Sequence, residues 1–254
     1  MSTTFPAVDR TVDPSVDFAA VTEAIASGRV PVAPTFAVDL YRDIHKGIRA
    51  ELFAITMAAG DADPLDRAAR AALAAHVTQV AGVLESHAHH EDAHVDEPLR
   101  AVAPELAERV DADHHRLEAD FAAAAALAGE LVGASGTDRR GGLQLLHLQL
   151  SAFTADYLRH QLTEERVVMP RLAEALGPED LGAINGAIIS SIPPDEMAMS
   201  LSFMLPAMNA DDRAELLGAM RAGAPAEVFE GVMGLARTVL DPAELRATRD
   251  RLGR

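Results

Sequence analysis

The sequence predicts an all-α protein: an up-down-up-down four-helix bundle followed by an additional C-terminal helical segment. Apolar residues make up 49% of the 254 residues and aromatic residues only 4%, a mixture dominated by alanine, leucine and valine that favours packed helices over sheets. Two long stretches place apolar residues at alternating steps of four and three, which marks the inward face of a helix. Short turns separate the long stretches and favour antiparallel neighbours.

The elements follow in order along the chain. Residues 1–36 are expected to form an N-terminal extension, with a short helix near 16–27 that prolines would end. Residues 37–176 are expected to form the bundle. Residues 177–254 are predicted to form a methionine-rich extension of short amphipathic helices separated by proline and glycine. The four long helices of the bundle are predicted at residues 39–59, 64–94, 104–133 and 138–175.

The overall charge excludes several classes of partner. The formal net charge of −17 at pH 7 disfavours binding to nucleic acid and to anionic membrane surfaces. The absence of cysteine rules out disulfides and thiolate metal sites, and it fits a reducing cytoplasm. We find no signal peptide and no apolar run long enough to span a membrane, so a cytoplasmic location is expected.

Polar residues interrupt the apolar seams of the second and fourth helices. One seam continues into His87 and Glu91, and the other continues into His160 and Glu164. Side chains four residues apart on a helix point in nearly the same direction. Buried, unpaired carboxylates cost several kcal/mol each and repel one another, and divalent cations would offset both costs. The predicted metal ligands are His45, His87, Glu91, His114, Glu118, His160 and Glu164.

This set of ligands is compatible with more than one metal and with more than one assignment of the ligands. Seven ligands exceed a tetrahedral zinc site, and they match two octahedral metal ions that share carboxylates; iron, manganese and zinc all accept imidazole and carboxylate. Taken singly, His45 and His114 could be core histidines and Glu118 could be solvated. Glu165 could replace Glu164 as a ligand if the helix were rotated. His89 and His90 lie off the seam and are expected to be exposed, and His94, one turn beyond Glu91 on the seam, is expected either to support the ligands or to lie at the end of its helix.

At these residues the chain resembles the hemerythrin-like family, also called the HHE cation-binding domain. The resemblance covers about residues 38–176 and lies in IHKGIRAEL, ESHAHHEDAHV, DADHHRLEADF and YLRHQLTEERVVMP. The tail is similar to an extension found in a subset of bacterial members. The resemblance implies a non-heme di-iron centre, and manganese or a mixed pair would use the same ligands. It further implies that Glu91 and Glu164 bridge the two irons, with His45 and His87 on one iron and His114, Glu118 and His160 on the other.

The predicted function follows from that resemblance and from one departure. Oxygen carriers of the family have histidine where this chain has Glu118, which puts reversible oxygen carriage in doubt. The first hypothesis is a di-iron protein that binds O2, or another small diatomic such as NO, for sensing, storage or protection. The alternative is an O2-activating oxidase or oxygenase acting on a small organic substrate or a peroxide, so enzymatic activity stays open and no catalytic residue is indicated. A metal-free scaffold is a third reading, and the tail could form a homodimer.

Overall fold

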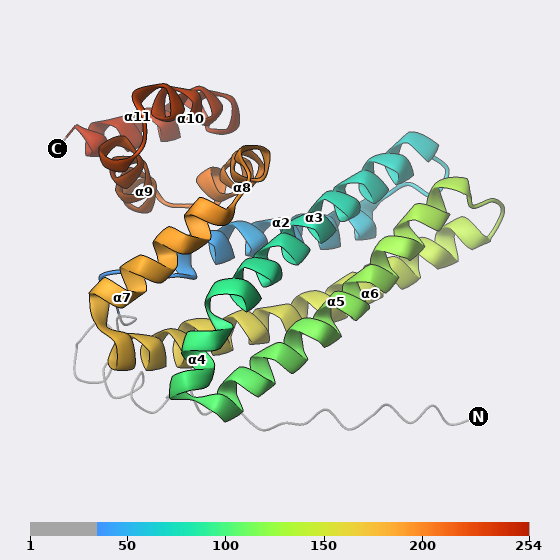
Figure 1. Cartoon of the computed structure of the whole chain (residues 1–254). Coiled ribbons are helices and arrows are strands. Elements are labelled where there is room, and N and C mark those ends of the chain that lie inside the picture. The colour runs from blue at the N-terminus through green and yellow to red at the C-terminus, as the bar shows by residue number, and fades with distance from the viewer. Residues whose placement is uncertain (1–34, 254) are drawn as a thin grey trace, which may run out of the picture.

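Four long antiparallel helices form the core of the molecule (Figure 1). The computed structural model describes residues 35–253, and it contains no strand within that range. The prediction of an all-α bundle with additional C-terminal helices is therefore confirmed. The helix predicted at residues 16–27 lies outside the described residues. The bundle consists of α2 (Arg42–Asp61), α3 (Arg67–His94), α5 (Pro104–Gly133) and α6 (Asp138–Thr163).

The turns between these helices have clear chemical causes. The side chain of Asp66 caps α3 by accepting hydrogen bonds from the backbone N–H groups of Ala68 and Ala69. The helix therefore begins at Arg67, three residues later than predicted from Pro64. A short helix that was not predicted, α4 (Asp96–Val102), lies between α3 and α5. Its third residue is Pro98, where the missing N–H costs little because the first turn of a helix has no partner for it.

The fourth helix extends past α6 and is broken at Gly177, close to the predicted end at residue 175, but the path to that point contains a turn that was not predicted. After α6 the backbone widens into a π-helical turn, η1 (Glu164–Val168), in which the N–H of Met169 donates to the carbonyl of Glu164. The chain then continues as α7 (Met169–Ser191), with Pro170 in its first turn. Gly177 interrupts α7 with φ +75° and ψ 173°, a left-handed conformation that favours glycine. The kink coincides with the predicted end of the bundle, and the domain boundary itself stays a prediction.

The bundle core contains the apolar seams that the sequence predicted. Residues of all four long helices are buried together, and Phe203 from the C-terminal extension joins them. Burial of these large side chains supplies most of the stabilisation of such a bundle. The predicted seam positions in this core are Leu73, Val77, Val80 and Leu84 on α3, and Leu146, Leu150, Phe153 and Tyr157 on α6.

The C-terminal helices form a second packed unit with its own core. These are α8 (Pro194–Ala207), α9 (Ala210–Gly223), α10 (Ala226–Val239) and α11 (Pro242–Leu252). Met233 is buried in this core and Met197 and Met220 pack against it, so these methionines fill the interior of the extension. No helix in residues 35–253 is long and apolar enough to cross a membrane.

The extension docks on α2 through a close approach at Gly47. A Cβ atom built on Gly47 would lie 2.5 Å from Cδ2 of Phe203 and 3.1 Å from Cγ of Met204. Ion pairs flank this contact, from Lys46 to Asp212 and from Arg42 to Glu215 at 3.2 Å. The segment of α2 that carries His45 is therefore fixed from outside by the extension.

We expect Gly47→Ala to destabilise the protein by about 1–3 kcal/mol, because the added methyl group overlaps Phe203 in a packed interface. The matched control is Gly82→Ala on α3, where a Cβ meets nothing within 4 Å. That change should stabilise the protein by roughly 0.5–1 kcal/mol through helix propensity. Urea denaturation measures both effects, and a stabilising Gly47→Ala would contradict the close packing described here.

Candidate metal centre

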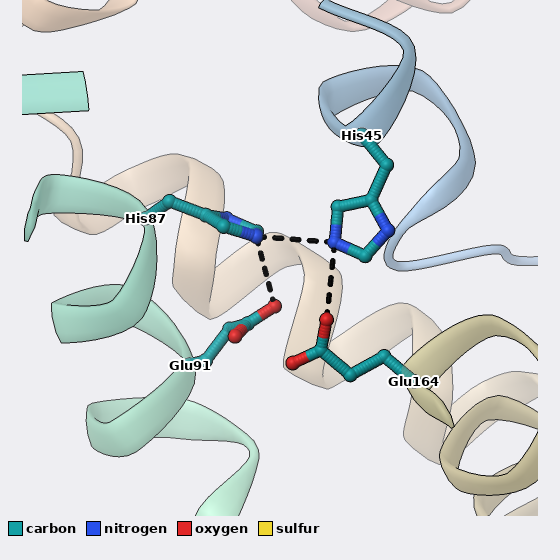
Figure 2. Close-up of side chains that lie close together, drawn as sticks. All are labelled: His45, His87, Glu91 and Glu164. Atoms are coloured by element: carbon teal, nitrogen blue, oxygen red, sulfur yellow. Dashed lines mark hydrogen bonds and ion pairs between the residues drawn. The ribbon is translucent and has the colours of Figure 1, made fainter. Parts of the chain in front are cut away.

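Six buried or nearly buried polar side chains meet in the middle of the bundle. Their ligand atoms fall into two overlapping groups, and within each group all ligand atoms lie within 4.8 Å of one another. Figure 2 shows one group, in which the side chains of α2, α3 and the start of η1 point toward a shared centre. The six residues are His45 on α2, His87 and Glu91 on α3, His114 on α5, His160 on α6 and Glu164 on η1.

The first group consists of His45, His87, Glu91 and Glu164. The Nε2 atoms of His45 and His87 are 3.1 Å apart. The Nε2 atom of His45 lies 3.4 Å from Oε2 of Glu164, and that of His87 lies 3.2 Å from Oε1 of Glu91. Each histidine thus turns the same ring nitrogen toward the centre, as neutral imidazole does when it binds a metal.

The second group consists of His114 and His160 with the same two glutamates. The Nε2 atom of His114 lies 3.2 Å from Oε2 of Glu91 and 3.5 Å from Oε1 of Glu164. The Nε2 atom of His160 lies 2.9 Å from Oε1 of Glu164. Because Glu91 and Glu164 belong to both groups, each carboxylate can bridge two metal positions.

Several of these atoms are close together without being hydrogen bonded. Both carboxylate oxygens of Glu91, both of Glu164 and Nε2 of His114 are buried and have no hydrogen-bond partner. Buried polar atoms in native proteins are almost always satisfied, and each exception calls for an explanation. Cations held by the two groups would satisfy all five atoms, since each of these three residues belongs to at least one group. The donor set of imidazole and carboxylate fits a first-row transition metal.

The two carboxylates strongly perturb the titration of the histidines around them. Burial lowers the pKa of His114, but the carboxylates of Glu164 and Glu91 outweigh burial and raise that pKa to about 11. Burial also lowers the pKa of His160, and Glu164 again prevails and raises it to about 9. Burial and the charge of Glu164 raise the pKa of Glu91 to about 7. Without a metal, the cluster therefore keeps protons on His114 and His160 at neutral pH.

Carboxylates from neighbouring helices hold the outer ring nitrogens. The Nδ1 atom of His114 lies 2.8 Å from Oδ1 of Asp92, and Nδ1 of His45 lies 3.0 Å from Oε1 of Glu165. The Nδ1 atom of His160 is 3.9 Å from Oδ2 of Asp113. Carboxylates in this position fix the ring orientation and raise the basicity of the inner nitrogen.

The carboxylates that face the outer ring nitrogens follow the order of the helices around the bundle. An acid on α3 holds the histidine of α5, an acid on α5 faces the histidine of α6, and an acid on η1 holds the histidine of α2. No acid on α2 holds the histidine of α3 in the same way, because the residues beside His45 are Ile44 and Lys46. Among the described residues, His87 pairs with no carboxylate other than Glu91. Burial and the nearby His45 hold the pKa of His87 well below its usual value.

One predicted ligand does not reach the cluster. Glu118 is exposed, and its place on the inner face of α5 is taken by Leu117, which is buried. The prediction that Glu118 faces the interior is wrong because residues three and four positions after His114 flank the same direction on a helix, and here the apolar residue turns inward. The other six predicted residues are brought together.

Sequence reasoning missed Asp92 and Asp113 and treated Glu165 as a substitute for Glu164 rather than as its complement. A signal for these roles was available, since each acid directly precedes or follows a ligand in the sequence. A residue next to an inward-facing ligand points toward the adjacent helix interface. His90 was expected to be exposed, but its side chain is only 12% exposed because it faces the C-terminal extension.

The geometry agrees with a comparison against known protein families. The hemerythrin HHE cation-binding domain matches residues 37–172, more than half of the chain. The chain belongs to the hemerythrin HHE family. The match covers the bundle and all six converging residues of this hemerythrin-like chain, and it ends before the C-terminal extension. No curated protein and no solved structure matches the chain significantly.

Metal binding should release protons, because a metal can bind only the deprotonated forms of the ligands. With the pKa of His114 about 11, that of His160 about 9 and that of Glu91 about 7, two protons leave the cluster above pH 7 and about three leave it below pH 7. Metal affinity should therefore fall about a hundredfold for each pH unit just above 7, and the fall should steepen toward about a thousandfold per unit below 7. Competition titrations with a chromophoric chelator between pH 6 and 8 measure this slope, and a flat profile would contradict the assigned protonation.

Proposed function

We propose that this chain holds a non-heme di-iron centre that binds O2, or another small diatomic such as NO, for sensing, storage or protection. The observation that carries the proposal is the pair of buried carboxylates common to both ligand groups, whose four oxygens all lack hydrogen-bond partners. Iron would supply redox chemistry and an open coordination position for the gas. Manganese or a mixed pair would fit the same donors.

The protein contributes two nearly equivalent sets of donors. Each metal position is offered two imidazoles, His45 with His87 or His114 with His160, and shares both carboxylates. The positions differ in their support, because His87 lacks the outer carboxylate that the other three histidines face. An imidazole without this support is a less basic and more mobile ligand. We therefore assign the weaker imidazole ligand, His87, to the position that it shares with His45.

The space beside the cluster favours a small ligand. A cavity of about 10 Å³, enough for roughly one water molecule, borders Glu91 and His114. Tyr41, Leu99 and Val110 also line it, so its wall is mainly apolar. A diatomic molecule fits this space, and an organic substrate would require helices α4 and α5 to move apart.

The alternative of an O2-activating oxidase or oxygenase loses its main support. That reading depended on Glu118 as an extra anionic oxygen ligand, and Glu118 is exposed. The small cavity also argues against an organic substrate. Enzymatic activity toward a peroxide stays compatible with the ligand set, and a homodimer stays open as well.

Gas binding is tested with the iron-loaded protein reduced under anaerobic conditions. We expect exposure to O2 or NO to change its optical and Mössbauer spectra, because the cavity beside Glu91 and His114 leaves room for a gas ligand. Removal of O2 by evacuation should restore the reduced spectrum of a carrier or sensor, whereas an oxidase would turn over and consume the gas. Spectra that do not respond to either gas would overturn the proposal.

The assignment of ligands is tested by a matched pair of glutamate variants. Glu164→Ala removes a carboxylate common to both groups, so most of the bound metal should be lost. Glu118→Ala removes an exposed carboxylate on α5, and its metal content should equal that of the wild type. Elemental analysis of both purified proteins decides the matter. Metal loss in Glu118→Ala, or full loading of Glu164→Ala, would refute the six-residue set.

A further inference from the structure

Three carboxylates face the outer ring nitrogens of the ligand histidines, and two of them are covered by arginine. Nη1 of Arg49 lies 2.7 Å from Oε1 of Glu165, and Nη2 of Arg116 lies 3.0 Å from Oδ1 of Asp113. Asp92 differs, because its side chain is 50% exposed and, among the described residues, pairs with its histidine on α5 and with no arginine or lysine. This carboxylate therefore presents its negative charge to water.

The side chain of Asp92 also lines the small cavity beside the cluster. Two more carboxylates, those of Asp96 on α4 and Asp111 on α5, line the same cavity. Their side chains are 33% and 50% exposed, whereas those of Glu91 and His114, which border the cavity from inside, are 9% and 7% exposed. The cavity thus joins three water-facing carboxylates to two buried ligands, where α4 links α3 to α5 (Figure 1).

The inner end of the cavity carries atoms without partners. Neither carboxylate oxygen of Glu91 is hydrogen bonded, and neither is Nε2 of His114. Between the two ends, Val95, Leu99 and Val110 form an apolar wall. A hydrated cation must release water to cross a space this small, and the loss is tolerated only where other charges or ligands replace that water. The outer carboxylates and the inner ligands supply both.

The charge at the outer end fits a cation rather than a gas. O2 and NO carry no charge, so acidic side chains do not speed their approach, whereas an acidic cleft with apolar walls raises the local concentration of cations and their rate of entry. Asp96 is partly neutralised by Arg100 at 2.8 Å. Asp111 lies 3.5 Å from His115 and, in the described part of the chain, has no arginine or lysine within ion-pair distance. Asp92 and Asp111 therefore supply most of the negative charge.

We propose that Asp92, Asp96 and Asp111 form the entrance through which a divalent metal ion reaches Glu91 and His114. The entrance adds no metal site, because the ion passes these carboxylates and stays at the two buried groups already described. The inference rests on the proposed metal centre and does not depend on which gas that centre binds. Asp111 is the best residue for a test, because it touches neither ligand, whereas Asp92 holds Nδ1 of His114.

The test is the rate of anaerobic Fe²⁺ uptake by the metal-free full chain, with a chelator stopping the reaction at set times and bound iron counted. Asp111→Asn should take up iron about threefold to tenfold more slowly than the wild type at low ionic strength. In 1 M KCl the Debye length is about 3 Å, so the two rates should become nearly equal. The final iron content should be unchanged, because Asp111 is not a ligand.

The matched control is Glu118→Gln. Glu118 is an exposed acid on the same helix, its loss changes the net charge by the same amount, and it does not line the cavity. This control should load at the rate of the wild type. Equal rates for Asp111→Asn and the wild type at low salt would overturn the proposal, as would an equal slowing in Glu118→Gln, which would assign the effect to net charge. A wild type that binds no iron at equilibrium would instead refute the metal centre itself.

A second variant tests the route apart from its charge. Val110→Phe enlarges a side chain between the two ends of the cavity, so uptake should be slower than in the wild type at low salt and in 1 M KCl alike. A final iron content equal to that of the wild type shows that the ligands keep their places. Uptake by Val110→Phe at the wild-type rate would mean that the ion enters elsewhere, and the proposal would fall.

Discussion

The structure depends on two carboxylates buried among four imidazoles at the centre of an apolar bundle. Glu91 and Glu164 are almost completely removed from water, and neither finds a hydrogen-bond partner. In a core that is otherwise made of leucine, valine and phenylalanine, such groups are tolerated only when positive charge compensates them. The compensating charge is either a proton held on a neighbouring histidine or a metal ion. The same residues therefore set both the stability of the bundle and the chemistry available to it.

Much of this arrangement could be predicted from the sequence. The helix-period patterns located the four long helices, and the polar pairs in two of the seams located four of the six converging residues, because burial of a carboxylate calls for a specific cause. The other two, His45 and His114, were found as histidines on the inward faces of the remaining helices. Glu118 could not be separated from Leu117 in this way. Both positions flank the inward direction of α5, and only packing against the other helices decides which one turns in.

The remaining features depend on contacts between distant segments, which periodicity within a helix does not record. The partial burial of His90 depends on how α7 and α8 return along α3, and the close approach at Gly47 depends on where Phe203 enters the bundle. The short helix α4 was not predicted, because Pro98, a residue that ordinarily ends a helix, here lies in the first turn of a new one. In each case a local signal was present, and its meaning was set by a neighbour far along the chain.

The π turn at residues 164–168 has a wider consequence for the shape of the molecule. A π turn contains one residue more than an α-helical turn spanning the same rise, and each residue rotates a helix by about 100°. That single surplus residue lets Glu164 and Glu165 serve opposite sides of the same imidazole ring at His45. It also sets the direction in which α7 leaves the bundle, before Gly177 turns the chain again toward the extension. The π turn thus links the inner coordination of the bundle to the path of the chain outside it.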